Sequence, residues 1–320
     1  MKTFLLFLCL MPGLAWQNAR AQDSSASVFC VVPLGVKGGS DESNLSAYLV
    51  SAQGSRDFIC LDAGTLYAGI RRAVENGVFT DSPDAVLKKY IHAYFISHPH
   101  LDHVAGLIMN SPEDAGKNIY GLPFCLDILK STYFTWKGWA NFADEGEAPA
   151  LGKYHYVRMI PGADTEVPGT PLRVTAFPLS HGSPFQSTAF LVNLRGQYLL
   201  YLGDTGADRV EKSDNLHRLW MAVAPLVMQK RLKAIFMEVS FPDEQPEKQL
   251  FGHLTPRLAM EEMEDLERIS GPGTLKGLSL VITHIKPIGG NEIKIKQQLR
   301  SQNNHSLQFI FPEQAVALRF

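Results

Sequence analysis

The sequence predicts an α/β fold in which mixed β-sheets are covered by helices on their outer faces. Short runs rich in β-branched and aromatic residues indicate strands, and longer segments carry the apolar periodicity of helices. The early strands follow one another directly, which is typical of an antiparallel meander. The later strands alternate with helices, which favours a sheet covered on its outer side.

The strands and helices can be placed along the chain. Strands are expected at 27–35, 45–52, 57–62, 91–97, 172–179, 188–194, 197–204, 234–240 and 278–285, and helices at 83–90, 215–230, 255–268 and 291–303. Ser82 and Thr255 are each followed by proline, so both are predicted N-caps. The segment 131–165 is rich in Trp, Tyr, Phe and Gly and lacks clean periodicity. It is either an irregular surface excursion or an insertion that covers the substrate.

The N-terminus resembles a secretory leader. Lys2 precedes a short apolar run at 4–15, and the small residues of 19–21 fit a cleavage site. The apolar run is shorter than the ~20 residues that cross a bilayer. We therefore expect residues 1–21 to be a signal peptide and 22–320 a single exported catalytic domain, periplasmic or secreted, with no membrane partner.

Charge and cysteine content limit the function further. The formal net charge is −2. The only charged residues of the leader are Lys2 and Arg20, so the mature protein is expected to be mildly acidic. It lacks the basic footprint of a nucleic-acid binder. Cys30, Cys60 and Cys125 do not form a disulfide framework. Cys30 and Cys60 could form one bridge, but buried free thiols are the commoner outcome.

The stretch "FISHPHLDHVAG" indicates a metal site. His98, His100, Asp102 and His103 follow an expected strand and precede an expected helix, so they lie on a loop. In extended chain, residues two apart point the same way, so His98 and His100 can share one metal ion. Asp102 and His103 can turn towards a neighbouring position as the helix begins, and Gly106 lets that helix pack closely. Imidazole and carboxylate are typical zinc ligands.

Further ligands are expected at later strand ends, because four residues cannot fill two metal shells. His181 in "FPLSHG", Asp204 in "YLLYLGDTG" and His284 in "LSLVITHIKP" each end an apolar run. A single polar residue in such a place is unremarkable. Three of them together favour a shared function.

These motifs, with Asp62 in "LDAG", resemble those of the metallo-β-lactamase superfamily. The resemblance implies a four-layer αββα sandwich of two mixed sheets with a dinuclear metal centre at one edge. It also implies ligand roles for the residues that match the motifs. His98, His100 and His181 would hold one metal, Asp102, His103 and His284 the other, Asp204 would bridge them, and Asp62 would orient a ligand from outside.

The residues around these motifs indicate one family within the superfamily. "HPHLDHVAGLIMNSPED", "AIFMEVSF" with "GHLT", and "THIKP" resemble class II 3′,5′-cyclic-nucleotide phosphodiesterases, a family with exported bacterial members. The Glu and His motifs also resemble those of tRNA 3′-end-processing enzymes. The resemblance implies hydrolysis of a cyclic nucleotide, with cAMP the expected substrate, by a hydroxide shared between two metals. Glu238 and His253 would protonate the leaving oxygen, and Asp102 counts as catalytic as well as a ligand.

Several alternatives stay open at this point. The metals are expected to be Zn²⁺, although iron or manganese suits similar ligands. The substrate could be another phosphodiester, a thioester or a lactam, and a non-catalytic exported nucleotide binder is a further alternative. Substrate contacts are expected from aromatic residues of 131–165: Trp136, Trp139, Phe142 and Tyr154. His92, His155, His217 and His305 fit no motif, and the sequence predicts no oligomeric state.

Overall fold

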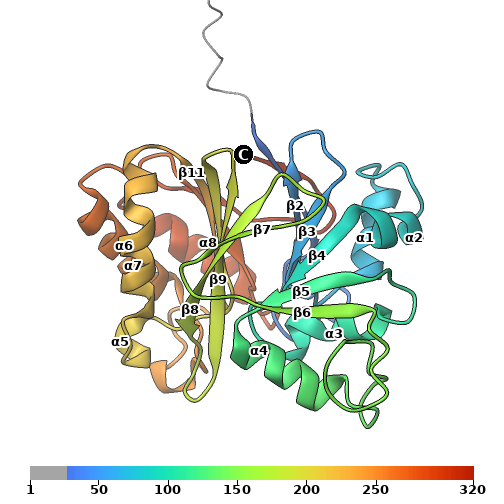
Figure 1. Ribbon diagram of the computed structural model, residues 1–320. Helices are drawn as coiled ribbons and strands as arrows, with labels where there is room; N and C mark the ends of the chain where they lie inside the picture. The colour runs from blue at the N-terminus through green and yellow to red at the C-terminus, as the bar shows by residue number, and fades with distance from the viewer. Residues whose placement is uncertain (1–26) are drawn as a thin grey trace, which may run out of the picture.

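Two seven-stranded mixed sheets pack face to face, with helices on both outer faces (Figure 1). The computed structural model describes residues 27–320, so the expected signal peptide lies outside the described residues. Within 27–320, no helix combines the length and the apolar character that crossing a bilayer requires. This four-layer arrangement confirms the expected fold class.

The first sheet has the order β14-β1-β2-β3-β4-β5-β6. Its strands are β1 Phe29–Gly35, β2 Ala47–Ala52, β3 Phe58–Leu61, β4 Ile91–Phe95, β5 Lys117–Gly121, β6 Tyr154–Arg158 and β14 Leu318–Arg319. β1, β2 and β3 form the expected antiparallel meander, and β3 to β6 then pair in parallel. Its outer face carries α1 Tyr67–Glu75, α2 Pro83–Ala85, a π-helix Val86–Tyr90, α3 Leu101–Asn110, α4 Pro123–Ile128 and a π-helix Leu129–Tyr133.

The second sheet repeats this plan in the order β13-β12-β11-β10-β9-β8-β7. Its strands are β7 Asp164–Glu166, β8 Arg173–Ser180, β9 Gln186–Leu194, β10 Gln197–Leu202, β11 Leu232–Glu238, β12 Ser279–Thr283 and β13 Gln308–Ile310. β7 to β10 are antiparallel, and β10 to β13 are parallel. Its helices are α5 Asp208–Glu211, α6 Asn215–Met228, a 3₁₀ turn Glu247–Gln249, α7 Pro256–Ser270 and α8 Asn291–Ser301.

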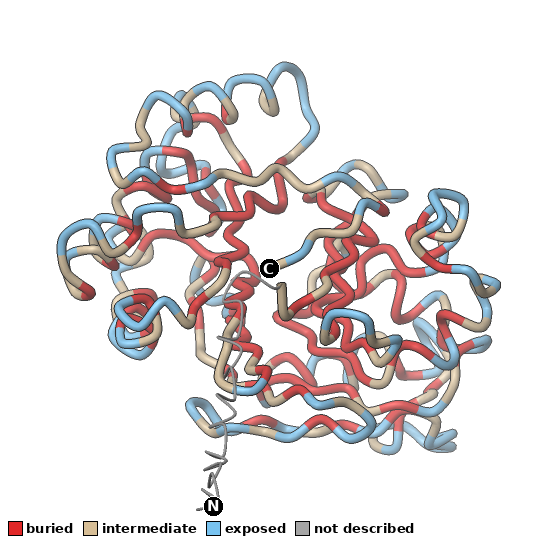
Figure 2. The backbone as a smooth tube through the Cα atoms, turned by 90° about the horizontal axis from the view of Figure 1, so that it is seen from above, coloured by how far each residue is buried: buried red, intermediate tan, exposed pale blue. Residues whose placement is uncertain are grey.

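Three apolar layers hold the sandwich together. Strand residues that point inwards from both sheets, such as Phe95 and Phe190, form the central layer. The outer layers join each sheet to its helices, for example through Leu107 of α3 and Trp220 of α6. Buried residues therefore follow the strands and the loops that carry Asp62, His98 and Asp204, while the outer helix faces and the remaining loops are mostly exposed (Figure 2). Burial of apolar surface on both faces explains why most strands are continuous apolar runs.

The expected caps are confirmed. The Ser82 side chain accepts a hydrogen bond from the backbone of Ala85, and the Thr255 side chain accepts one from Leu258. The expected helix at 83–90 begins as α2 and continues as a π-helix. Among the described residues, Cys30, Cys60 and Cys125 are free thiols, and Cys60 donates to the carbonyl of Asp62.

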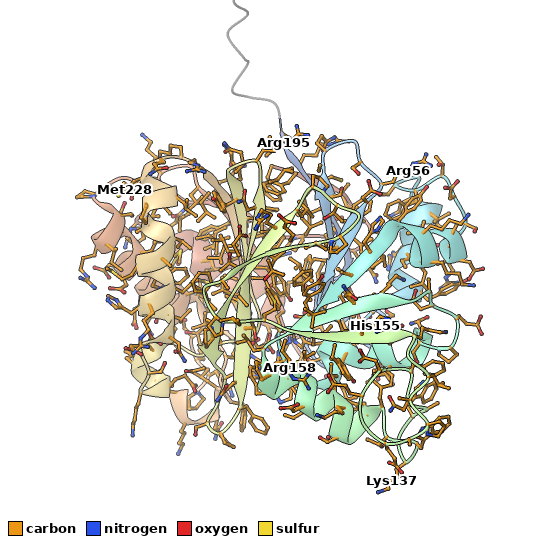
Figure 3. The ribbon with its side chains drawn as sticks, viewed as in Figure 1. Arg56, Lys137, His155, Arg158, Arg195 and Met228 are labelled. Atoms are coloured by element: carbon orange, nitrogen blue, oxygen red, sulfur yellow. The ribbon has the colours of Figure 1, made fainter. Side chains whose placement is uncertain are left out.

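The segment 131–165 is more regular than expected. It contains β6, which extends the first sheet in parallel with β5, and β7, which begins the second sheet. The expectation of an irregular segment was therefore wrong for these strands. An irregular loop remains between Phe134 and Lys153, and Figure 3 shows Lys137 at its outer tip and His155 on the exposed side of β6.

Candidate metal centre and active site

The expected ligands converge at one edge of the sandwich. β8, β10, β11 and β12 all run in the same direction, so their carboxyl ends meet at one end of the second sheet. His181, Asp204 and His284 follow three of these strands directly. In the first sheet, β3 and β4 are parallel, and the loops after them carry Asp62 and the four residues of the cluster motif. The site therefore lies where the two sheets open.

The seven expected ligands fall into two neighbouring groups, and His253 joins two further groups, one with His181 and Asp204 and one with Glu238 and His284. In each group all the ligand atoms lie within 4.8 Å of one another. Of the two groups of expected ligands, one is His98, His100 and His181, and the other is Asp102, His103, Asp204 and His284. The division follows the expected turn of the chain from His100 into α3.

Asp204 occupies the centre of both groups. Its Oδ2 lies 3.7 Å from His98 Nε2 and 3.9 Å from His181 Nε2. The same oxygen lies 3.3 Å from His103 Nε2 and 3.2 Å from His284 Nε2. Burial would raise the pKa of Asp204, but the neighbouring His284 and His103 outweigh it and hold the pKa well below its usual value. The residue is therefore an anion in contact with both groups.

The second ring nitrogen of several histidines is held by a partner outside the cluster. His98 Nδ1 lies 3.0 Å from Ser97 Oγ, and His103 Nδ1 lies 2.8 Å from Asp62 Oδ2. Gly252 and Ser240 play the same part. The Gly252 carbonyl lies 2.8 Å from His181 Nδ1, and Ser240 Oγ lies 2.9 Å from His284 Nδ1. Such contacts fix the ring so that its Nε2 faces the centre.

Two ring nitrogens show that these residues suit a metal. His98 Nε2 and His103 Nε2 are buried and have no hydrogen-bond partner among the described residues. Buried polar atoms normally have a partner, and an unmade bond costs about 1–3 kcal/mol. Imidazole nitrogens that face a shared carboxylate are suitable ligands for divalent zinc, iron or manganese.

Asp62 lies outside the cluster, as expected. Its carboxylate accepts hydrogen bonds from the backbone and side chain of Ser97 and from Tyr201, and it contacts His103. Asp62 and His284 both have positive φ values, 54° and 58°, although neither is glycine. Such backbone strain is typical of functional sites.

Close backbone packing holds α3 and the β1–β2 loop against the site. A Cβ on Gly106 would lie 2.7 Å from the Ala63 carbonyl, so α3 packs closely, as expected. A Cβ on Gly38 would lie 2.3 Å from the His284 ring. Only glycine permits these approaches.

Glu238 and His253 form a pair beside the cluster. Glu238 Oε1 lies 3.0 Å from His253 Nδ1, and the carboxylate also accepts bonds from Ser240 Oγ and the Leu254 backbone. The His253 ring stacks on His284 at a centroid distance of 5.2 Å. Burial and the charge of Asp204 raise the pKa of Glu238, while burial lowers the pKa of His253. His253 thus lies against the cluster, and the buried Glu238 supports its ring.

The expected aromatic substrate contacts are not supported. Tyr154 is fully buried and donates to Asp114, so its assignment was wrong. Trp136 donates to the Pro149 carbonyl within the loop, and Phe142 packs against the core beneath Lys153. Trp139 donates to Ser111 at the carboxyl end of α3, while the cluster lies at its amino end. Trp139 therefore lies at the end of α3 away from the cluster, and its role as a substrate contact stays a prediction.

Other residues of the site were not expected from the sequence. Ser97, Ser240 and the Gly252 carbonyl hold cluster histidines in place, and Tyr201 donates to Asp62. Ser97 and Ser240 adjoin recognised motifs, but serine is too common to indicate a role. The histidines left out of the motifs lie beside carboxylates elsewhere: His92 with Asp57, His155 with Asp144, His217 with Asp265 and His305 with Glu267.

Comparisons with known proteins agree with this geometry. Residues 27–315 match the family described as "cAMP phosphodiesterases class-II". The chain is 42% identical to the 3′,5′-cyclic-nucleotide phosphodiesterase of Aliivibrio fischeri, across 100% of this chain and 99% of the relative.

Solved structures show the same fold. The crystal structure of unliganded yeast PDE1 superposes with a TM-score of 0.82 at 23% identity, covering 92% of this chain and 100% of that one. The metallo-β-lactamase fold protein YhfI of Bacillus subtilis gives 0.61 at 17% identity, covering 91% and 99%. The expected metallo-β-lactamase fold is therefore confirmed.

Proposed function

Because the chain belongs to the class II cAMP phosphodiesterase family, we propose that it hydrolyses 3′,5′-cyclic nucleotides, cAMP above all, to 5′-monophosphates. The observation that carries this proposal is the convergence of six imidazole and carboxylate side chains around Asp204, which is itself the seventh. A cyclic phosphodiester carries a negative charge that repels hydroxide, and its alkoxide leaving group is poor. A site for hydrolysis must overcome both obstacles.

We propose that the cluster binds two divalent cations, zinc before iron or manganese. His98, His100 and His181 would hold one, Asp102, His103 and His284 the other, and Asp204 both. The cations would supply positive charge to the phosphate and activate a shared water as hydroxide near neutral pH. Asp62 and Ser240 keep the rings of His103 and His284 in the orientation that this requires.

His253 would hold the proton that the 3′ oxygen receives as it leaves. The raised pKa of Glu238 and the lowered pKa of His253 favour a proton on the carboxyl group beside Nδ1, so the ring would donate its Nε2 proton as it receives the Glu238 proton at Nδ1. Proton transfer of this kind contributes about 10²–10⁴-fold in rate. The cluster residues would thus bind the phosphate, and His253 would protonate the leaving 3′ oxygen.

The first test compares substrates and cluster variants. His98→Ala and Asp204→Ala should abolish cAMP turnover, because each removes a ligand, while circular dichroism shows an intact fold. The wild-type protein should be assayed with cAMP, cGMP, bis-p-nitrophenyl phosphate, a glutathione thioester and a β-lactam, alongside elemental analysis. Preference for the thioester or lactam, or tight cAMP binding without turnover, would contradict the proposal.

The second test isolates proton donation. His253→Ala should lower kcat for cAMP by about 10²–10⁴-fold. It should change hydrolysis of bis-p-nitrophenyl phosphate far less, because nitrophenolate leaves without a proton. Equal losses on both substrates would show that His253 supports the site in another way.

We also propose that the protein is exported after cleavage near Ala21. The support is the sequence of residues 1–21 alone. The mass and N-terminal sequence of protein recovered from the periplasm or medium would test it, and an intact Met1 in cytoplasmic material would contradict it.

A further inference from the structure

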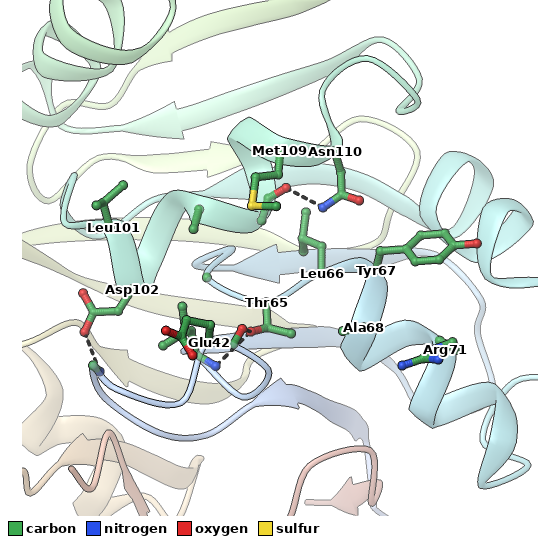
Figure 4. Close-up of a pocket in the computed structure, with 15 residues that line it drawn as sticks. Glu42, Thr65, Leu66, Tyr67, Ala68, Arg71, Leu101, Asp102, Met109 and Asn110 are labelled. Atoms are coloured by element: carbon green, nitrogen blue, oxygen red, sulfur yellow. Dashed lines mark hydrogen bonds between the residues drawn. The ribbon is translucent and has the colours of Figure 1, made fainter. Parts of the chain in front are cut away.

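A large cavity lies between α1, α3 and the loop that joins β1 to β2 (Figure 4). Its volume is about 850 Å³, within the ~300–1,000 Å³ typical of small-molecule sites. Leu101, Ala105 and Met109 of α3 form one wall, and Leu66 and Ala68 lie on the other. Leu101 and Met109 are 61% and 68% exposed, so packing within the chain does not account for this apolar surface.

The cavity begins at the metal cluster. Asp102 and Gly39 line it, and the Gly39 N–H donates to Asp102 Oδ2 at 3.0 Å. His284 Nε2 lies 3.1 Å from the same carboxylate oxygen. Figure 4 shows Asp102 at one end of the cavity and Tyr67 with Arg71 towards the other. A molecule with its phosphate at the cluster can therefore extend into the cavity.

We infer that this cavity binds the nucleoside part of the substrate, with the purine between the apolar walls of α1 and α3. This inference rests on the proposed function. From Asp102 to Asn110 the helix rises about 12 Å, comparable with the length of a nucleoside. The flat faces of a purine suit the apolar walls, and Glu42, Arg71 and Asn110 supply polar groups for its edge and for the ribose hydroxyl.

A rival place for the purine lies on the opposite side of the cluster. Phe185 is 54% exposed, and its ring centroid is 5.1 Å from that of His100. The cavity is favoured because it offers apolar walls on two sides of a ligand, whereas one exposed ring offers a single face. The experiment therefore includes Phe185→Ala as a direct competitor.

The test fills the cavity without touching the cluster. Ala105→Leu and Ala68→Leu add bulk to opposite walls at partly exposed helical positions. Each should raise KM for cAMP, and the inhibition constant of adenosine 5′-monophosphate, at least tenfold. Hydrolysis of bis-p-nitrophenyl phosphate, which has no nucleoside, and inhibition by inorganic phosphate should stay within twofold. Ala222→Leu, at an exposed position of α6, is the matched control and should change none of these values.

The outcomes separate the two proposals. Wild-type protein that cleaves bis-p-nitrophenyl phosphate but not cAMP would sink the proposed function and this inference together. Wild-type protein that cleaves cAMP, with both filled variants unchanged in KM, would overturn the inference alone. A tenfold rise in KM for Phe185→Ala, with no effect of the filled variants, would place the purine at the rival site. Circular dichroism and melting temperature check that each variant folds.

Discussion

The properties of the site depend on individual residues that do not themselves face its centre. Ser240 is the clearest case, because its hydroxyl lies within hydrogen-bond distance of Glu238, His253 and His284. One small side chain thus connects the proposed proton donor with a cluster histidine. Tyr201 has a similar part beneath Asp62.

A buried acid far from the cluster makes the stability of the fold depend on pH. Glu262 of α7 accepts hydrogen bonds from Trp220 Nε1 at 3.0 Å and from the Asp208 backbone at 3.1 Å. Burial raises its pKa from 4.5 to about 7. The folded state therefore binds the Glu262 proton more tightly than the unfolded state does.

This shift predicts the direction of a pH effect. The contribution of Glu262 is fully present below about pH 4.5 and is lost as pH rises through about 7. The loss is up to about 3 kcal/mol, since each pKa unit corresponds to about 1.4 kcal/mol. In Glu262→Gln the free energy of unfolding should fall less between pH 5 and pH 8 than in the wild type. Urea denaturation at both values measures this, and an unchanged difference would contradict it.

At the scale of elements, the parallel strands explain why the ligands meet. Each strand delivers one polar residue at its carboxyl end, and parallel pairing brings those ends together. α3 adds Asp102 and His103 from its first turn. The position of α3 against the loop after β3 is therefore important for the site.

Gly106→Ala tests the packing of α3. The added methyl group would lie 2.7 Å from the Ala63 carbonyl and 2.8 Å from the Leu66 nitrogen, so the helix must move. Overpacking of this kind typically costs about 1–3 kcal/mol. We expect a lower free energy of unfolding and weaker metal binding in a chelator competition assay.

The matched control for that variant is Gly290→Ala. No atom lies within 4 Å of a Cβ at Gly290, which precedes α8. Gly290 is the N-cap of α8, where alanine is less favourable than glycine, so the substitution should cost about 0.5–1 kcal/mol and should leave metal binding unchanged. Equal effects of the two substitutions would show that close packing at Gly106 is unimportant.

At the scale of the whole molecule, the cluster joins the two halves of the sandwich. His98, His100, Asp102 and His103 come from the first sheet and its helix, while the second sheet supplies His181, Asp204 and His284. Bound metal would therefore link the halves across the edge at which they open.

Metal removal should consequently lower the melting temperature. A ligand at 1,000 times its Kd stabilises the folded state by about 4 kcal/mol, and each kcal/mol shifts Tm by roughly 2–4 °C in a large domain. EDTA should lower Tm by on the order of 10 °C, and added Zn²⁺ should restore it. Asp204→Asn should show a much smaller shift in the same calorimetric scan. A Tm unaffected by EDTA in metal-loaded wild type would contradict this.

Elements with clean apolar patterns were predicted, and those that depend on distant partners were missed. β5 contains Lys117, which can be buried because its ammonium group donates hydrogen bonds to Asp114 and to the Leu87 carbonyl. No local pattern reveals such partners. α1 contains Gly69, and glycine disfavours a helix locally. Packing requires glycine here, because a Cβ would lie 2.2 Å from the Leu34 carbonyl. Tyr154 was assigned to the substrate because an aromatic residue in sequence does not show whether it faces the core.

The sequence by itself determined the strands with continuous apolar runs, the capped helices and the polar residues at strand ends. These are local features, fixed by side-chain type and spacing. Only the tertiary structure decided which groups hold the histidine rings and where a nucleoside-sized cavity opens. Those depend on contacts between residues far apart in the chain, such as Asp102 with His284, and such distances are set by how the two sheets pack.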